Sequence, residues 1–253
     1  MNDMLPPAAV SRLADHAEQA IDKGFDHVDT WIFDLDNTLY PPSSRLFDQI
    51  DDKITAYVAN QFGIDGISAR ALQKYYYRVH GTTLKGLMSE EGLDPDHFLA
   101  FVHDIDHSVL VPAPDLAAAI ARLPGRRFVL TNGSRHHAER VATRLGVADL
   151  FEDIYDIAAS NYVPKPSQEA YDAFLKRHGV QAPKAAMFED LAKNLIAPHR
   201  LGMRTVLVSP AEGAGDALDR TTGPDDLVAG PHVDHVTTDL PGFLSALAIV
   251  ARD

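Results

Sequence analysis

The sequence predicts an α/β fold in which a doubly wound, mostly parallel, Rossmann-like sheet carries an inserted all-helical cap domain. Downstream of residue 116, strand-like apolar runs alternate with amphipathic helical runs, which is typical of βαβ units. The earlier run HVDTWIFDLD has the continuous apolar centre of a strand covered on both faces. Between these regions lies a long stretch of helical periodicity without a convincing strand, which indicates a helical insertion.

The expected strands follow one another through the core. They are HVDTWIFDLD, RFVLTNGS, DIYDIAAS, AAMFED, MRTVLVS and HVDHVTTD, with helices between them at HHAERVATRLG, SQEAYDAFLKRHG and LAKNLIAPHRLG. In the insertion, apolar residues spaced by three and four from Leu46 to Phe62 predict a helix that Gly63 ends. Further helices are expected in SARALQKYYYRVHG, LKGLMSEEG and PDHFLAFVHDI.

These patterns divide the chain into two domains. Residues 1–42 and 116–253 form the expected catalytic core, and residues 43–115 form the expected cap. Residues 1–24 are predicted to form a short amphipathic helix. The acidic, Gly- and Pro-rich stretch 211–230 is predicted to be an exposed loop.

Composition narrows the classes of function. With 45% hydrophobic and 23% charged residues, the chain resembles an ordinary soluble globule. It has no apolar run near the ~20 residues of a transmembrane helix and no signal-peptide pattern, so we expect a cytoplasmic protein. The absence of cysteine excludes disulfides, thiolate nucleophiles and Cys-ligated zinc. A net charge of −13 argues against nucleic acid polymers and anionic membranes as partners, but a divalent cation still allows a small phosphate ester.

Asp34 and Asp36 come directly after the first expected strand, followed by Asn37 and Thr38. Side chains at i and i+2 of an extended segment point the same way, so both carboxylates can face one ligand. One carboxylate can attack an electrophile such as phosphorus, and the other can carry protons to the leaving oxygen and from water. The alternative interpretation is a β-turn or the start of a helix that happens to contain acidic residues.

A hydroxyl–glycine turn follows the second expected strand. Thr131, Asn132 and Gly133 stand immediately before a helix, where backbone N–H groups and the helix dipole suit a phosphate. The same stretch also fits an ordinary helix start, with Ser134 as the N-cap residue.

Two further polar groups lie at later strand ends. Lys165 stands between two prolines that stiffen its loop, although a solvated surface lysine is the alternative. Glu189 and Asp190 end the run AAMF, where acids can bind Mg²⁺ or simply favour the start of a helix. Because ligands of open α/β sheets bind at the carboxyl ends of the strands, the four groups together indicate one crevice.

As a set, these motifs resemble the phosphatase branch of the haloacid dehalogenase superfamily. Its DxDxT motif is met by Asp34, Asp36 and Thr38, and its later motifs are met by Thr131, Lys165, and Glu189 with Asp190. The resemblance implies that Asp34 is the nucleophile that forms an aspartyl-phosphate and that Asp36 is the general acid/base. It implies phosphate contacts and charge neutralisation from Thr131, Asn132, Gly133 and Lys165. It also implies Mg²⁺ bound by Asp34, the backbone carbonyl of Asp36, Asp190 and, directly or through water, Glu189.

Within the superfamily the chain most resembles the pyrimidine 5'-nucleotidase subgroup. The resemblance is carried by FDLDNTLYPPSSRLF, YYYRVHGTTLKGLM and LTNGSRHHAERVATRLGVADLFEDI. It implies that the insertion covers the active site and contacts the leaving group. The candidate substrate residues are Tyr40, Arg78, His80, Thr82 and Lys85. The chain departs from many relatives at Leu191, where small hydroxyl residues are frequent, and at Asn194, where many have a second acid.

The resemblance implies a Mg²⁺-dependent phosphomonoesterase acting on nucleoside 5'-monophosphates or similar small phosphorylated metabolites. Asp36 argues against the dehalogenase branch, which lacks the second acid. A phosphomutase acting on sugar phosphates shares all four motifs, and a non-catalytic phospho-ligand-binding relative is the remaining alternative. His136 and His137 begin a helix and are interpreted as surface residues. One ring of Tyr75–Tyr77 is a candidate to stack on a base or sugar.

Overall fold

The computed structural model describes residues 24–210 and 229–247. The helix predicted over 1–24 and the loop predicted over 211–230 lie, apart from their last residues, outside the described residues. In the described part of the chain, no helix combines the length and apolar character needed to cross a membrane.

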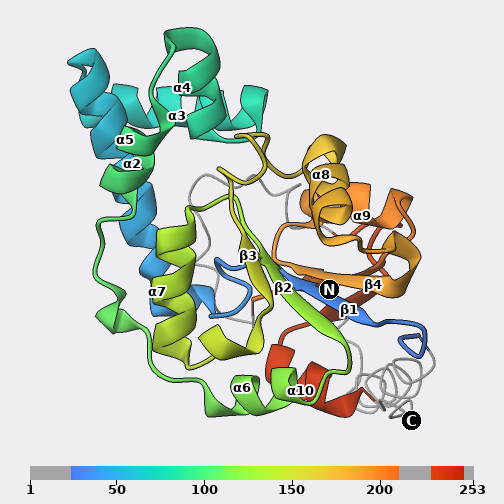
Figure 1. Ribbon diagram of the computed structural model, residues 1–253. Helices are drawn as coiled ribbons and strands as arrows, with labels where there is room; N and C mark the ends of the chain where they lie inside the picture. The colour runs from blue at the N-terminus through green and yellow to red at the C-terminus, as the bar shows by residue number, and fades with distance from the viewer. Residues whose placement is uncertain (1–23, 211–228, 248–253) are drawn as a thin grey trace, which may run out of the picture.

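A six-stranded sheet with the strand order β3-β2-β1-β4-β5-β6 forms the centre of the fold (Figure 1). All the neighbouring strands pair in parallel, as the alternating pattern predicts. The strands are β1 (Thr30–Phe33), β2 (Arg126–Leu130), β3 (Asp153–Tyr155), β4 (Ala185–Glu189), β5 (Arg204–Val208) and β6 (His235–Thr237).

Helices surround the sheet and connect its strands. The α-helices are α2 (Leu46–Phe62), α3 (Gly66–His80), α4 (Thr83–Glu91), α5 (Pro95–Val102), α6 (Pro114–Ala121), α7 (Arg135–Leu145), α8 (Gln168–His178), α9 (Ile196–Arg200) and α10 (Leu240–Ala246). Short 3₁₀ turns are η1 (Pro42–Ser44), η2 (His107–Val109), η3 (Ala148–Leu150), η4 (Ala182–Lys184) and η5 (Ala192–Leu195).

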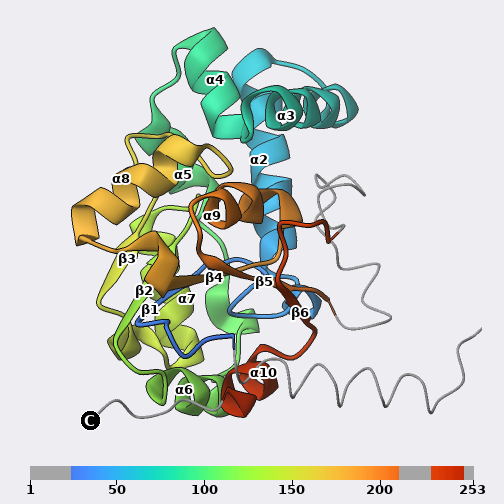
Figure 2. The same ribbon diagram turned by 90° about the vertical axis from the view of Figure 1, so that its right-hand side faces the viewer.

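The two faces of the sheet pack against different helices, as Figures 1 and 2 show. Trp31 and Phe33 of β1 join a core cluster with α6, α7 and α10. Ile32, between them, joins the opposite cluster with α8 and α9. Every residue of β1 is buried, which confirms the prediction of a strand covered on both sides.

The stretch LAKNLIAPHRLG is not one continuous helix. It begins as the 3₁₀ turn η5 and becomes α-helical only in α9. Pro198 explains the break, because its ring has no N–H and clashes with the carbonyl four residues earlier in an α-helix. That carbonyl, of Asn194, instead accepts a hydrogen bond from the hydroxyl of Tyr171 at 2.6 Å.

The expected insertion contains helices α2 to α5, which lie together above the sheet in Figure 1. They have a hydrophobic cluster largely of their own, centred on residues such as Val58, Tyr76 and Leu87. Leu46 and Ile50, at the start of α2, belong instead to a core cluster of the sheet. α2 therefore runs from the core into the helical layer.

Gly86 allows α4 to pack closely on α3, and its replacement is expected to destabilise the protein. A Cβ atom at this position would lie 2.4 Å from Cδ1 of the buried Tyr76 ring. We expect Gly86→Ala to lower the free energy of unfolding by about 1–3 kcal/mol, because the overpacked helices must move apart. The measurement is urea unfolding of both proteins.

The matched control is Gly66→Ala, at the start of α3, where no described heavy atom lies within 4 Å of the added Cβ. This exposed change should leave stability unchanged or raise it by up to about 1 kcal/mol, since alanine favours helix. Equal effects of the two substitutions would contradict the packing argument.

Candidate active site

The candidate catalytic and metal-binding residues lie where the order of the strands in the sheet reverses. β1 pairs with β2 on one side and with β4 on the other, so the connections diverge at this point. Asp34 directly follows β1, and Glu189 is the last residue of β4. In doubly wound sheets this crevice is where ligands bind.

Lys165 holds the ends of β1 and β4 together. Its Nζ donates to Asp34 Oδ1 at 2.5 Å, to Glu189 Oε2 at 2.7 Å and to the carbonyl of Leu130 at 2.9 Å. The side chain is only 2% exposed, so this is a buried ion network and not a solvated surface lysine. Burial alone would lower the pKa of Lys165, but the carboxylates of Asp34 and Glu189 raise it above its ordinary value.

The acids outnumber this cation. Burial and the charge of Glu189 raise the pKa of Asp34 from 3.8 to about 7, although Lys165 opposes them. Burial, Glu189 and Asp34 likewise hold the pKa of Asp190 well above its usual range. Thr38 Oγ1 also donates to Asp34 Oδ2 at 3.1 Å. The site therefore has unbalanced negative charge that a further cation would relieve.

The geometry of the acids fits a metal ion. Asp34, Glu189 and Asp190 each present a carboxylate oxygen, and these oxygens lie within 4.8 Å of one another. Asn194 Nδ2 donates to Glu189 Oε1 at 2.9 Å, while its buried Oδ1 has no partner among the described residues. An all-oxygen donor set of this kind suits a hard divalent cation, directly or through bound water.

Asp36 has different surroundings from Asp34. Its Oδ1 accepts from the hydroxyl of Tyr40 at 2.5 Å and lies 2.8 Å from Nε2 of His137. Burial alone would raise the pKa of Asp36, but His137 and the Tyr40 hydrogen bond lower it below its usual value. The hydroxyl of Tyr40, a residue expected to face substrate, is thus engaged with Asp36, and its side chain is 2% exposed.

The interpretation of His137 as a surface residue is wrong. Its side chain is fully buried, whereas the neighbouring His136 is exposed. The physical reason is the orientation of α7, whose positions 137, 138 and 141 all face inward. This places the ring of His137 beside Asp36.

The turn after β2 has the features expected of a phosphate-binding loop. Thr131 Oγ1 accepts from the backbone N–H of Gly133 at 2.9 Å, which leaves its own proton available to a ligand. A Cβ at Gly133 would lie 3.3 Å from Thr131 Oγ1 and 3.7 Å from Asp36 Oδ2, so glycine keeps this space open. Ser134 caps α7 by accepting from the N–H of His137, as the alternative interpretation of this stretch predicts.

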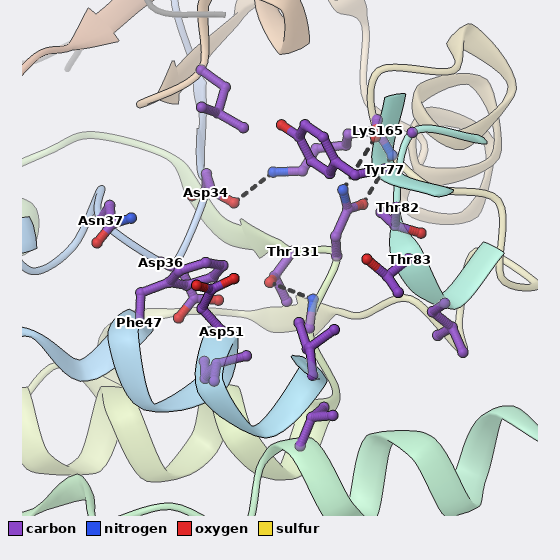
Figure 3. A pocket seen from close by; sticks show the side chains of 18 of the residues that line it. Asp34, Asp36, Asn37, Phe47, Asp51, Tyr77, Thr82, Thr83, Thr131 and Lys165 are labelled. Atoms are coloured by element: carbon purple, nitrogen blue, oxygen red, sulfur yellow. Dashed lines mark hydrogen bonds and ion pairs between the residues drawn. The ribbon is translucent and has the colours of Figure 1, made fainter. Parts of the chain in front are cut away.

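The side chain of Asn132 fixes the loop that carries Lys165. Its Oδ1 accepts from the backbone N–H of Lys165 at 2.9 Å, and its Nδ2 donates to the carbonyl of Lys165 at 3.1 Å. Figure 3 shows the hydrogen bond that joins Lys165 to Asp34. The amide therefore positions the lysine, and any contact of Asn132 with phosphate would come from its backbone.

One pocket joins these residues to the helical layer. Its cavity is about 160 Å³, and its core side is lined by Asp34, Asp36, Thr131, Asn132, Gly133, Lys165, Glu189, Asp190 and Asn194. On the helical side it is lined by polar groups from α2 to α4 and by apolar residues of α2, α4 and α5, among them Asp51, Gln73, Tyr77, Thr82, Thr83, Phe98 and Leu99. Figure 3 shows Asp51, Tyr77, Thr82 and Thr83 on this side.

Of the residues expected to face substrate from the cap, only some line the pocket. Thr82 lines the pocket. Arg78 is exposed, and His80 Nε2 lies 2.7 Å from Oε1 of Glu90, so neither belongs to the lining described above. Lys85, at the first turn of α4, is also outside that lining, and its N–H donates to Thr82 Oγ1 at 3.1 Å.

Sequence reasoning missed a buried polar network in the helical layer. Gln73 Nε2 donates to Asp51 Oδ1 at 2.8 Å, and Arg70 forms an ion pair with the same carboxylate. Thr55 Oγ1 donates to Gln73 Oε1 at 2.6 Å. The available signal was a polar residue on a buried helix face: Asp51 lies on the inner side of α2, and Gln73 on that of α3.

Comparison with known proteins identifies the family. A family model of haloacid dehalogenase-like hydrolases matches residues 28–202. This chain belongs to the haloacid dehalogenase-like hydrolases. A curated relative is phosphate metabolism protein 8 of Saccharomyces cerevisiae, which is 26% identical over 195 residues, or 70% of this chain. The alignment covers 60% of the yeast protein, which is less than two thirds of its length.

Solved structures of the family share the fold. L-2-haloacid dehalogenase from Xanthobacter autotrophicus has a TM-score of 0.54 at 16% identity, over 86% of this chain and 97% of that one. YfnB, a hydrolase of the family from Bacillus subtilis whose structure is bound to magnesium, has a TM-score of 0.52 at 15% identity, over 88% of this chain and 99% of that one. At such identities the likeness establishes the Rossmann-like architecture alone.

The substitution Asp34→Asn is expected to stabilise the metal-free protein at neutral pH. Since the pKa of Asp34 rises from 3.8 to about 7 on folding, the unfolded chain loses this proton at a lower pH than the folded chain does. The destabilising effect of the carboxylate is therefore absent below about pH 4, grows as the pH rises and is complete above about pH 7.

Urea unfolding in EDTA tests this expectation. The Asn variant should be more stable by about 2–4 kcal/mol near pH 8, with a much smaller difference near pH 4. A difference that shrinks as the pH rises would show that Lys165 outweighs the burial of Asp34.

Proposed function

We propose that this protein is a Mg²⁺-dependent phosphomonoesterase that acts on small phosphorylated metabolites through an aspartyl-phosphate on Asp34. The observation that carries the proposal is the pair Asp34 and Asp36 in one pocket, with different partners. Asp34 is bonded to the ammonium of Lys165, whereas Asp36 is bonded to a phenol and an imidazole. Two carboxylates with distinct surroundings suit a nucleophile and an acid/base.

In the first step, an oxygen of Asp34 attacks phosphorus and the bond from phosphorus to the ester oxygen breaks. The negative charge of the bound phosphate favours the protonated form of Asp36, which gives its proton to the departing oxygen, and that oxygen leaves as an alcohol. Lys165 orients Asp34 and favours its ionised form against the effect of burial, and its positive charge offsets charge on the phosphoryl group. The hydroxyl of Thr131 donates to a phosphoryl oxygen.

In the second step, the carboxylate of Asp36 takes a proton from water as that water attacks phosphorus. The bond from phosphorus to Asp34 breaks, and inorganic phosphate leaves with Asp34 restored. A bound Mg²⁺, held by Asp34, Asp190 and the backbone carbonyl of Asp36 with Glu189 close by, would neutralise phosphoryl and carboxylate charge. The name of the yeast relative, a phosphate metabolism protein, supports phosphate chemistry.

Among small phosphorylated metabolites, we propose nucleoside 5'-monophosphates as the substrate class. Its support is the helical side of the pocket, where the hydroxyl of Thr83 and the rings of Phe47, Tyr77 and Phe98 line the cavity. Hydrogen-bonding groups and aromatic rings are what a nucleoside requires. The cavity of about 160 Å³ is small, which favours compact phosphates as the alternative substrates.

The proposal predicts a loss of turnover of at least about 10³-fold in Asp34→Asn, because no covalent intermediate can form. The assay is phosphate release from nucleotides, sugar phosphates and cofactor phosphates, with Mg²⁺ and with EDTA. Asp149→Asn, which changes an exposed carboxylate on the far 3₁₀ turn η3, is the matched control and should keep full activity.

Activity of folded Asp34→Asn equal to that of the control would refute the nucleophile assignment, and an undiminished rate in EDTA would refute the metal requirement. Transfer of phosphate to a sugar phosphate in place of its release to water would identify a phosphomutase. Binding of phosphate esters without turnover of any of them would identify a non-catalytic relative.

A second prediction concerns substrate choice. Tyr77 lines the pocket, whereas the adjacent Arg78 is exposed. We expect Tyr77→Ala to reorder the ranking of nucleotides by at least about 10-fold in kcat/KM, while p-nitrophenyl phosphate changes by less than about threefold. Arg78→Ala should leave the ranking unchanged. If Arg78→Ala reorders the ranking and Tyr77→Ala does not, Arg78 and not Tyr77 contacts the leaving group.

A further inference from the structure

Three buried histidines next to Asp36 have no role in the two steps proposed above. His103, His107 and His137 are 7%, 2% and 0% exposed. The first two lie on the segment that leaves α5, and the third lies in the first turn of α7. The rings of His103 and His137 are stacked, with centroids 4.6 Å apart and an interplanar angle of 8°. The cluster therefore joins the end of the helical layer to the acid/base residue.

A line of hydrogen bonds runs through this cluster to Asp36. Nδ1 of His107 lies 3.1 Å from the carbonyl of Ile105. Nε2 of the same ring lies 3.1 Å from Nδ1 of His137. Nε2 of His137 lies 2.8 Å from Oδ1 of Asp36.

The backbone carbonyl at the start of this line fixes the direction of the bonds. A carbonyl only accepts, so Nδ1 of His107 carries hydrogen. Burial lowers the pKa of His107 to about 4, so the ring is neutral and its Nε2 accepts. Nδ1 of His137 must then donate to it, and Nε2 of His137 shares one proton with the carboxyl of Asp36.

These contacts leave the two oxygens of Asp36 unequal. Oδ1 has both partners, the hydroxyl of Tyr40 and the ring of His137. Oδ2 has no hydrogen-bond partner among the described residues and lies 3.7 Å from the position that a Cβ at Gly133 would occupy. The carboxyl group is therefore anchored by one oxygen and presents the other beside the phosphate-binding turn.

We propose that His137, held in one tautomer by His107, is a positioning residue that aims Oδ2 of Asp36 at the leaving oxygen. The inference rests on the proposed function, in which Asp36 protonates that oxygen. His103 supports the ring of His137 by stacking, and its Nδ1 lies 2.9 Å from the hydroxyl of Ser134. Asp36 is thus oriented by residues outside the phosphate site.

The test compares substrates with different leaving groups. His137→Leu should lower kcat/KM by at least about 100-fold on an alkyl phosphate, whose alkoxide needs a proton. On p-nitrophenyl phosphate, whose phenolate leaves unprotonated, the loss should stay below about tenfold. The ratio kcat/KM reports steps only up to departure of the leaving group, so the hydrolysis of the intermediate does not blur the comparison. Equal losses on both substrates would overturn the proposal.

Two variants serve as controls. His136→Leu makes the same change one position earlier, at an exposed side chain, and should leave both rates within about twofold. His137→Gln keeps a side-chain N–H that can donate to Asp36, and should recover at least about tenfold of the alkyl phosphate rate lost in His137→Leu. If His137→Leu does not fold, the comparison rests on His137→Gln and His137→Asn, and an equal loss of both rates in the folded variants would again overturn the proposal.

A double-mutant cycle separates positioning from a general structural role. In an Asp36→Asn background, His137→Leu should lower the remaining activity on p-nitrophenyl phosphate by less than about twofold, because its effect passes through Asp36. If the loss of activity in the double variant equals the product of the losses in the two single variants, His137 acts independently of Asp36. That result would overturn the proposal.

A spectroscopic measurement separates failure of this inference from failure of the proposed function. In ¹⁵N spectra of histidine-labelled protein, the signals lost in His137→Gln identify His137. We expect an Nδ1 that carries hydrogen and an Nε2 whose shift changes in Asp36→Asn. If no phosphate ester is hydrolysed but this pattern is present, the proposed function fails while the positioning contact stands. If esters are hydrolysed and the Nε2 signal ignores Asp36→Asn, the positioning inference fails by itself.

Discussion

The buried ammonium of Lys165 is the interaction on which the site depends. It joins Asp34 after β1, Glu189 at the end of β4 and the carbonyl of Leu130 at the end of β2. Acids could not otherwise be brought so close, because burying uncompensated carboxylates costs several kcal/mol each. One cation among three acids still leaves an excess of negative charge. The same network that fixes the strand ends therefore also creates the demand for a divalent ion.

The second constraint is that two carboxylates, separated by one residue, must behave differently. The backbone alone cannot achieve this, since side chains at i and i+2 of an extended segment face the same way. Their partners come from distant parts of the chain: Lys165 for Asp34, and His137 for Asp36. Asp34 thus lies in a buried ionic network, whereas Asp36 is hydrogen-bonded to the phenol of Tyr40 and the imidazole of His137. The chemistry is assigned by tertiary contacts and not by the motif.

The sequence predicted the parallel sheet and its strand-end chemistry because both follow from local pattern. Continuous apolar runs such as Trp31–Phe33 and the residues that follow them require no knowledge of packing. His137 was predicted wrongly because the sequence does not show which of two neighbouring histidines in a helix faces the core. Asp51 and Gln73 were missed because a polar residue in a helix is usually taken to lie on the surface. Only their contact with each other, from two different helices, explains why they are buried. Pro198 divides the helix predicted over LAKNLIAPHRLG, because it has no N–H to donate to the carbonyl of Asn194.

The same contrast explains why reaction type is easier to infer than substrate. The residues that we propose to bind phosphate and metal lie at strand ends whose relative positions are set by paired backbones. The residues that we propose to face the leaving group lie on α2 to α4, which belong to a helical layer with a hydrophobic cluster largely of its own. This layer meets the core through side-chain contacts such as Asp96 of α5 with Tyr162 and Tyr77 of α3 with Lys193. Such contacts can change without disturbing the sheet, so substrate choice can diverge while Asp34, Asp36 and Lys165 stay in place.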